Sequence, residues 1–317
     1  MNKSSPKQVL FILGTAHTGS TLLSLMLGSH NQIFAVGELS NLAVRCDKGK
    51  PICDICEGGC NFWNHQFSPI EQQRLADCLQ HQRLHRFIPL RAERSIRGLI
   101  GNDKIFRPYT SIFSKLPKAT TTLVDSTKTV YWITLQLQLP EFQRNNPKSI
   151  KPKLLHLVKD GRAVMASYLR RQPNLNVEKL SQKWSQRVTA SQQLFSKFPE
   201  TDRLRIAYED LATEPESTLQ EICDFLGVEF TPALMCYWEN DHHFISGNTG
   251  TRSLVQKYRQ KSKSSKTSHR DYKLYAEEVG FQIKLDLRWK NELSSEQLDV
   301  FDQVAGEVNK PYAWNKS

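Results

Sequence analysis

The stretch VLFILGTAHTGSTLLSLML, residues 9–27, decides the fold of this chain. Residues 9–13 are all apolar and predict a buried strand. A loop that begins at Gly14 and ends at Gly19 follows, and residues 20–27 read as an apolar helix. Backbone N–H groups at a helix start lack partners within the helix, and the helix dipole favours negative charge there. The stretch therefore predicts a cradle for an anion.

The spacing of this loop is that of a Walker A loop, with one change. Gly14, Gly19 and Thr21 fit the pattern, but Ser20 stands where a Walker A loop has lysine. Nucleotide-triphosphate hydrolases use that lysine on the β- and γ-phosphates. The loop is therefore suited to a phosphate-type group that is not a triphosphate.

A second segment has a similar organisation. Residues 153–159, KLLHLVK, predict another buried strand, and the turn Asp-Gly-Arg leads into the helical sequence AVMASYLRR. Lys159 ends the strand, Ser167 lies in the second turn of the helix, and Arg171 follows one turn later on the same face. Two cations and a hydroxyl near one strand–helix junction indicate a site for a second phosphate.

These segments resemble the PAPS-dependent sulfotransferases, where PAPS is 3′-phosphoadenosine 5′-phosphosulfate, the sulfuryl donor. GTAHTGSTLL is similar to the family's 5′-phosphosulfate loop, and HLVKDGRAVMASYLRR to its 3′-phosphate segment. RIAYEDLATEPESTLQEICDFLGVEF matches the family's Tyr-Glu-Asp-Leu strand and the helix that ends in Phe-Leu-Gly. HHFISGNTGTRS resembles the Gly-Asn-x-x-x-Arg loop of the bacterial, Golgi-like branch. The four motifs occur in the family's order and span residues 9–252.

The resemblance implies a set of nucleotide-binding residues and a fold. It assigns contacts with PAPS, or with its product 3′,5′-adenosine bisphosphate, to His17, Thr18, Gly19, Ser20, Thr21, Lys159, Ser167, Arg171, Tyr208, Asn248 and Arg252. Two of these depart from the family pattern: His17 and Lys159 each stand where arginine is usual. Both keep a hydrogen-bond donor without the bidentate guanidinium fork, so donor affinity is expected to be weaker or pH-dependent.

The order of elements favours an α/β fold with a P-loop-type parallel sheet flanked by helices. Further strands are predicted at residues 122–125 and 203–208, and helices at 177–198 and 215–226. We expect residues 1–317 to form one sulfotransferase domain. Residues 41–120 are irregular and are expected to form a cap that shapes the acceptor pocket. Residues 256–273 are strongly basic and read as a solvated, flexible loop, or as a lid over the donor.

Composition narrows the choice of partners. The net charge is +11, which suits an anionic ligand as well as a solvated basic surface. No run of about 20 apolar residues indicates a membrane span, and the N-terminus lacks the features of a signal peptide, so a cytoplasmic protein is expected. Basic residues do not alternate with aromatic ones in the manner of a nucleic-acid surface. A small-molecule acceptor is the expected partner.

Four of the seven cysteines form a cluster: Cys46, Cys53, Cys56 and Cys60. The spacing Cys-x6-Cys-x2-Cys-x3-Cys is compatible with a structural zinc site, with reduced thiols, or with a disulfide, the last being disfavoured in a reducing cytoplasm. His242 and His243 precede the Gly-Asn motif. Adjacent residues on an extended segment point to opposite sides, so this pair is interpreted as structural.

Sulfuryl transfer needs a base for the acceptor and positive charge near the leaving group. Glu38, in AVGELSN, matches a glutamate that faces the acceptor in relatives with this Gly-Glu pattern, and Lys128, at a strand end, can reach the transferring group. The alternatives are a capping or surface glutamate and a solvated lysine. The competing functions are a P-loop nucleotide or metabolite kinase and a non-catalytic anion-binding protein. The sequence leaves the acceptor, and the choice between O- and N-sulfation, open.

Overall fold

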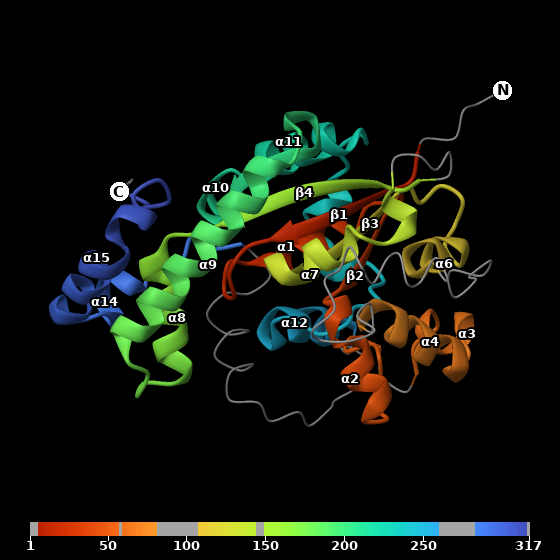
Figure 1. Cartoon of the computed structure of the whole chain (residues 1–317), viewed down its shortest axis with the longest axis horizontal. Helices are drawn as coiled ribbons and strands as arrows, with labels where there is room; N and C mark the ends of the chain where they lie inside the picture. The colour runs from red at the N-terminus through yellow and green to blue at the C-terminus, as the bar shows by residue number, and fades with distance from the viewer. Residues whose placement is uncertain (1–5, 57–58, 81–106, 144–148, 260–282, 316–317) are drawn as a thin grey trace, which may run out of the picture.

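A five-stranded, wholly parallel β-sheet forms the centre of the computed structural model (Figure 1). The structure describes residues 6–56, 59–80, 107–143, 149–259 and 283–315. The strand order is β2-β3-β1-β4-β5. The strands are β1 (Gln8–Leu13), β2 (Ile33–Gly37), β3 (Thr122–Lys128), β4 (Lys151–Val158) and β5 (Arg203–Ala207). An α/β fold with a P-loop-type parallel sheet, as predicted, is confirmed.

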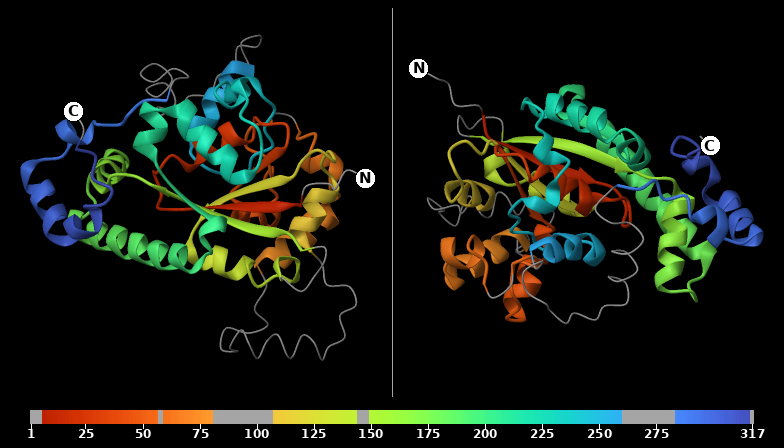
Figure 2. Two further views of the ribbon diagram at one scale, coloured as in Figure 1. Left: turned by 90° about the horizontal axis from the view of Figure 1, so that it is seen from above. Right: turned by 180° about the vertical axis from the view of Figure 1, so that it is seen from behind.

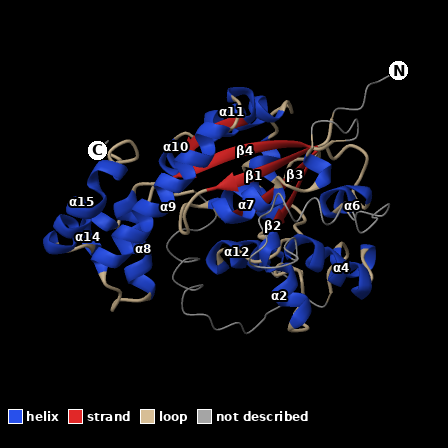
Figure 3. Cartoon of the chain, in the orientation of Figure 1, coloured by secondary structure: helices blue, strands red, loops and turns tan. Residues whose placement is uncertain are grey.

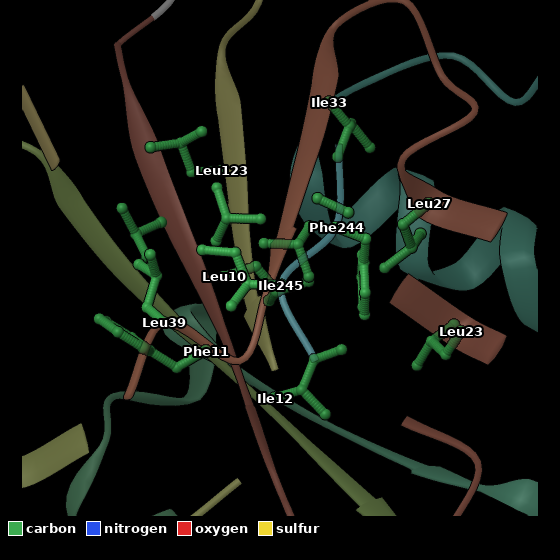
Figure 4. Close-up of a cluster of buried hydrophobic side chains, with 14 of the residues drawn as sticks. Leu10, Phe11, Ile12, Leu23, Leu27, Ile33, Leu39, Leu123, Phe244 and Ile245 are labelled. Carbon is green, nitrogen blue, oxygen red and sulfur yellow. The ribbon is translucent and has the colours of Figure 1, made fainter. Parts of the chain in front are cut away.

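Burial explains why the central strand is an unbroken apolar run. β1 pairs with β3 on one side and β4 on the other, and every residue from Gln8 to Leu13 is buried. A strand covered by helices on both faces has no solvent-facing side, so alternation of polar and apolar residues disappears. Figure 4 shows Leu10, Phe11 and Ile12 of β1 in this core, together with Phe244 and Ile245 from a distant part of the chain.

Helices cover both faces of the sheet (Figure 3). Seen from above, α9 lies on one side of the sheet, and α10 and α11 lie on the other (Figure 2). Contacts place α1 against β2 and β3, and α7 against β3 and β1. The helices of this region are α1 (Ser20–Leu27), α7 (Val130–Gln136), α8 (Gly161–Arg171), α9 (Val177–Lys197), α10 (Tyr208–Thr213) and α11 (Pro215–Leu226).

The segment expected to be a cap, residues 41–120, carries short helices and no strand in its described part. They are α2 (Leu42–Asp47), α3 (Trp63–Gln66), α4 (Pro69–Gln80) and α6 (Pro108–Ser114). The cysteine-containing stretch between α2 and α3 has no regular structure where it is described. In Figure 1, α2, α3 and α4 lie below the sheet, on the same side as α12 (Thr249–Arg259), whereas α6 lies near the right-hand end of the sheet.

The C-terminal part packs against the second predicted phosphate segment. Helices α14 (Trp289–Glu292) and α15 (Ser295–Asn309) contact α8, and α15 also contacts α9 (Figure 1). The carboxylate of Asp160 caps α8 through the Arg162 N–H and also accepts hydrogen bonds from Asn309 and the Trp314 N–H. The end of the chain thereby fixes the turn that follows β4.

Most of the predicted elements are present, with some differences. The four predicted strands are observed as β1, β3, β4 and β5, whereas β2 was not predicted as a strand. Short 3-10 turns join several elements, at Leu39–Asn41, Pro140–Phe142, Glu200–Asp202, Pro232–Leu234 and Tyr237–Glu239. Most of the basic segment 256–273 lies outside the described residues. None of the described helices combines the length and apolar character needed to cross a membrane.

Candidate active site

The phosphate loop, residues 14–21, connects β1 to α1 in a shape that requires glycine. Gly19 has φ 85° and His17 has φ 66°, so the chain turns sharply before α1. A Cβ atom on Gly14 would lie 2.6 Å from the Leu157 carbonyl oxygen, which shows how closely the loop approaches β4. Among the described residues, none accepts a hydrogen bond from the backbone N–H groups of residues 17–21. The predicted anion cradle, which includes Thr18, Ser20 and Thr21, therefore has its donors available.

Tyr208 and Lys159 form one wall of this cradle. A Cβ atom on Gly19 would lie 2.5 Å from Cδ2 of Tyr208, so the ring packs directly on the loop. The Nζ atom of Lys159 lies 4.4 Å from the centre of the same ring and 3.4 Å from Oδ2 of Asp286. The Lys159 side chain is only 5% exposed, and burial lowers the pKa of its amine while Asp286 opposes that change. A buried cation is thus held beside the loop by one carboxylate and one aromatic face.

His17 and Ser167 connect the two predicted phosphate segments. The Ser167 Oγ atom lies 3.1 Å from Nδ1 of His17, and the His17 ring packs edge-on against Tyr168 at 4.4 Å. Burial lowers the pKa of His17 to about 4, and the positive charges of Arg171 and Lys159 add to this effect. The imidazole is therefore neutral at pH 7. Arg171 itself is exposed at the end of α8.

A hollow of about 240 Å³ lies next to this contact. It extends from Thr15 of the phosphate loop to the start of α9, and apolar, aromatic and basic side chains share its surface. The lining residues are Thr15, Tyr168, Gln172, Leu175, Leu180, Lys183, Trp184 and Arg187. Aromatic faces and cations beside an anion cradle are suited to an anionic ligand with a flat ring.

Glu38 and Lys128, the two predicted catalytic residues, lie side by side. Glu38 follows β2, Lys128 ends β3, and the Lys128 ammonium forms an ion pair with Oε1 of Glu38. Asn41 donates a hydrogen bond of 3.0 Å to the other carboxylate oxygen. Lys128 has φ 71°, a conformation that non-glycine residues rarely adopt, and such strain often occurs at functional positions. Both side chains remain partly accessible to solvent.

The Gly-Asn loop, residues 244–248, closes on the phosphate loop from the other side. The backbone N–H of Asn248 donates to Oγ1 of Thr21 at 2.8 Å, and Gly247, with φ 94°, packs against the same threonine. Arg252 is placed elsewhere: its Nη1 atom lies 2.8 Å from Oδ2 of Asp54, a carboxylate that also pairs with Arg45. Asn248 thus contacts the phosphate loop, whereas Arg252 joins α12 to the cysteine-containing stretch.

The cysteine cluster differs from the predicted set in one member. Cys53, Cys56, Cys60 and His243 place one ligand atom each within 4.8 Å of one another. Cys46, on α2, is not a member of this group among the described residues, and His243 takes its place. The interpretation of His243 as merely structural rested on the local direction of adjacent side chains. The local sequence does not show that the segment carrying His243 folds back onto the cysteines.

Sequence reasoning missed other residues that hold the site together. Asp286, which pairs with Lys159, lies in no motif, and only its position on the C-terminal segment brings it to β4. Asp125 is buried and accepts hydrogen bonds from the Tyr109 hydroxyl and the Trp132 indole at 2.9 and 2.8 Å. Burial raises the pKa of Asp125. This acid fixes the end of β3 and hence the position of Lys128.

The geometry gives an α/β protein with a candidate anion-binding loop at the carboxyl edge of its parallel sheet, the edge at which folds of this kind bind ligands. Comparison with known proteins gives the family: a model of the sulfotransferase domain matches residues 7–311, so the chain belongs to the sulfotransferase family, whose chemistry is sulfuryl transfer. No curated protein matches the chain.

Three solved structures that are similar to this chain are sulfotransferases or sulfotransferase domains. The sulfotransferase domain of the Synechococcus PCC 7002 olefin synthase is 21% identical, covers 87% of this chain and 96% of its own, and has a TM-score of 0.51. The sulfotransferase domain of the curacin biosynthetic pathway is 19% identical over 87% of this chain and 99% of its own, with a TM-score of 0.48. Mouse sulfotransferase SULT7A1, complexed with PAP, is 13% identical over 98% and 92%, with a TM-score of 0.45.

Proposed function

We propose that this protein transfers a sulfuryl group from PAPS to a hydroxyl or amine of a small-molecule or sugar acceptor. One observation carries the donor assignment: the 3.1 Å contact between Ser167 and His17 brings the second phosphate segment against the phosphate loop. A nucleotide with two separate phosphates could therefore contact both segments at once. PAPS differs from ATP in having a 3′-phosphate as well as a 5′ anionic chain.

Each part of the site has a role in this proposal. The N–H groups of residues 17–21, which donate to no described residue, stabilise the negative charge that develops on the departing 5′-phosphate. Lys159, Ser167 and Arg171 hold the 3′-phosphate, and Tyr208 packs against the nucleotide. Asn248 and Arg252 close the site over the nucleotide from the other side. The Asn248 N–H donates to Oγ1 of Thr21, and Arg252 is held by its ion pair with Asp54.

Proton transfer is assigned to the pair at the edge of β2 and β3. Glu38 accepts the proton of the acceptor hydroxyl or amine as the acceptor attacks sulfur. Lys128, held beside it, supplies positive charge to the oxygens of the transferring group. The cap at residues 41–120 shapes the acceptor pocket. We also propose a cytoplasmic location.

Calorimetry tests the donor assignment. 3′,5′-Adenosine bisphosphate should bind over a hundredfold more tightly than 5′-AMP, because two charge-assisted contacts contribute about 3 kcal/mol. Lys159→Ala should remove much of this difference and leave the affinity for 5′-AMP nearly unchanged. Equal affinities of the wild-type protein for the two nucleotides would contradict the proposal.

A second experiment identifies the acceptor. The protein is incubated with labelled PAPS and a pooled metabolite extract, and mass spectrometry then detects compounds that gain one sulfuryl group. Transfer of label to a compound of the extract supports the proposed reaction. Turnover of ATP with a requirement for magnesium, in place of PAPS, would instead favour a kinase.

A further inference from the structure

The group formed by Cys53, Cys56, Cys60 and His243 has the composition of a metal site. Its four ligand atoms lie within 4.8 Å of one another, and two of the cysteines are buried. The Nδ1 atom of His243 is 3.2 Å from Sγ of Cys60 and 3.4 Å from Sγ of Cys56. In a tetrahedral zinc site, bonds of about 2.3 Å to sulfur and 2.0 Å to nitrogen put neighbouring ligands about 3.5 Å apart. The two nitrogen–sulfur distances therefore match such a site, and the remaining ligand atoms lie close enough to complete it with small shifts.

The surroundings of the group favour thiolates. The backbone N–H groups of Ile55 and Cys56 donate to Sγ of Cys53, and that of Trp63 donates to Sγ of Cys60, each at 3.4 Å. Hydrogen bonds of this kind stabilise the negative sulfur that a metal needs. Three sulfurs and one imidazole are the ligands of a closed, structural zinc site.

His243 is also held in place by its neighbours. Its ring stacks on Phe62, with centroids 5.7 Å apart, and the indole N–H of Trp63 donates to its backbone carbonyl at 2.8 Å. Both contacts come from residues next to Cys60. The imidazole is thus oriented toward the thiols by groups outside the ligand set, as in other protein metal sites.

The position of His243 in the chain gives the site a consequence for the active site. The Gly-Asn loop begins at the next residue. Two of its carbonyls accept hydrogen bonds: that of Phe244 from the Asp54 N–H at 2.9 Å, and that of Ile245 from the Glu38 N–H at 2.7 Å. The Asn248 N–H donates to Oγ1 of Thr21. Figure 4 shows Phe244 and Ile245 among the side chains of the core, and Ile245 forms a bridge to Gly37 at the end of β2. A metal at His243 would therefore fix a loop that contacts both the proposed base and the phosphate loop.

We propose that Cys53, Cys56, Cys60 and His243 bind one Zn²⁺, and that this ion links the cysteine stretch to the Gly-Asn loop. The ion joins segments that are 183 residues apart in the sequence. Its role is structural, because four protein ligands leave no open position for substrate. The part of the proposal that concerns nucleotide binding rests on the proposed function, whereas the metal site itself does not.

Elemental analysis of the purified full-length protein is the first test. One zinc per chain is expected. Protein loaded with Co²⁺ should show thiolate-to-metal charge transfer and the visible bands of a tetrahedral ion. Purified protein without metal that also fails to bind added Zn²⁺ or Co²⁺, or protein that holds an iron–sulfur chromophore, would overturn the zinc assignment.

Matched variants test the ligand set. In competition with a chromophoric chelator, Cys60→Ser and His243→Ala should each lower zinc affinity at least tenfold, whereas Cys46→Ser should retain one zinc with wild-type affinity. Loss of zinc from Cys46→Ser, or its full retention in His243→Ala, would overturn the set. If a ligand variant fails to fold, the Co²⁺ spectrum of the wild-type protein can still be measured, and it should show charge-transfer bands of three thiolate ligands. Because Cys46 lies outside the proposed ligand set, Co²⁺-loaded Cys46→Ser should give the same spectrum.

The link to the Gly-Asn loop has a readout that does not need the reaction. Chelation of zinc from the wild-type protein should increase hydrogen exchange at the amides of residues 244–248 and should weaken 3′,5′-adenosine bisphosphate binding several-fold. Unchanged exchange at these amides after loss of the metal would overturn the link. A third outcome separates the two proposals. If chelation speeds exchange at these amides but the zinc-loaded protein binds no 3′,5′-adenosine bisphosphate, the proposed donor is wrong and the metal proposal is still supported.

Discussion

The carboxylate of Glu38 is paired with the ammonium of Lys128 across the ends of two neighbouring strands, β2 and β3. Parallel strands bring their carboxyl ends to one edge of the sheet, which is where α/β proteins bind their ligands. Two residues 90 positions apart in the sequence thus form one unit at this edge. Their pairing makes the roles proposed for them testable together.

Glu38→Gln should lower turnover by about 10² to 10⁴, because the amide cannot accept the proton of the acceptor, while 3′,5′-adenosine bisphosphate binding stays nearly unchanged. Lys128→Met should also reduce turnover. Since the two residues act as one unit, the double variant should lose less than the product of the single losses. Steady-state kinetics checks this, with the exposed Glu216→Gln as a control. Wild-type turnover in Glu38→Gln would move the base to another residue.

Lys159→Ala should raise the KM for PAPS more than it lowers kcat, because the 3′-phosphate is remote from the sulfur and its contact is similar in the ground and transition states. Ser167→Ala should act in the same direction by about 1 kcal/mol. Both residues serve one phosphate, so the double variant should lose less than the sum. Lys179→Ala, on the exposed side of α9, is the control for charge alone. If the free-energy losses of the two single variants add exactly in the double variant, or if only kcat falls, Lys159 and Ser167 do not bind the same phosphate.

His17 should make nucleotide affinity depend on pH. Its pKa is about 4 in the free protein, and a bound phosphate would raise that pKa by stabilising the imidazolium. Binding then takes up a proton, so affinity should increase as the pH falls from 7 toward 5. Because the phosphates of the nucleotide titrate near pH 6 as well, the quantity to compare is the slope for the wild-type protein against that for His17→Gln. If calorimetry gives the same dependence of affinity on pH for both proteins, His17 does not take up a proton when the nucleotide binds.

Gly19→Ala should destabilise the protein by more than the cost of placing alanine in a left-handed backbone conformation. Gly19 and Gly227 both have positive φ, but a Cβ on Gly19 would meet the Tyr208 ring, whereas one on Gly227 would meet nothing within 4 Å. Gly227→Ala should cost about 1 kcal/mol of unfolding free energy. Gly19→Ala should cost more and should also abolish nucleotide binding. Thermal unfolding and calorimetry measure both, and equal effects of the two variants would contradict the contact.

The sheet was largely predictable because strands buried on both faces are unbroken apolar runs. β1 is such a run from Val9 to Leu13, and β4 is largely apolar from Leu154 to Val158, with His156 as the one polar residue there. The glycine loop after β1 sets the position of the first helix. β2 was missed because Ile33–Gly37 includes Ala and ends in Gly, both weak strand formers, so local pattern does not separate it from a loop. Pairing with β3 makes it a strand.

The site was predictable only as far as its residues lie in local motifs. The positions of the phosphate loop, Lys159 and Ser167 could be predicted, since each lies at a strand–helix junction or within the first two turns of the helix that follows it. The contact of Ser167 with His17, the Asp286 partner of Lys159 and the approach of His243 to the cysteines all join distant parts of the chain. No local pattern encodes such contacts. They follow from the packing of the Gly-Asn loop and the C-terminal segment against the sheet.

The bridge between Ile245 and Gly37 also affects an outer strand of the sheet. β2 is at one end of the strand order, so its outer side carries N–H and C=O groups that a strand from another molecule could pair with. Ile245 accepts from the Glu38 N–H and donates to the Val36 carbonyl, and so occupies the carboxyl end of that side. The segment that positions the proposed base thereby also occupies part of the edge at which another molecule's strand could pair.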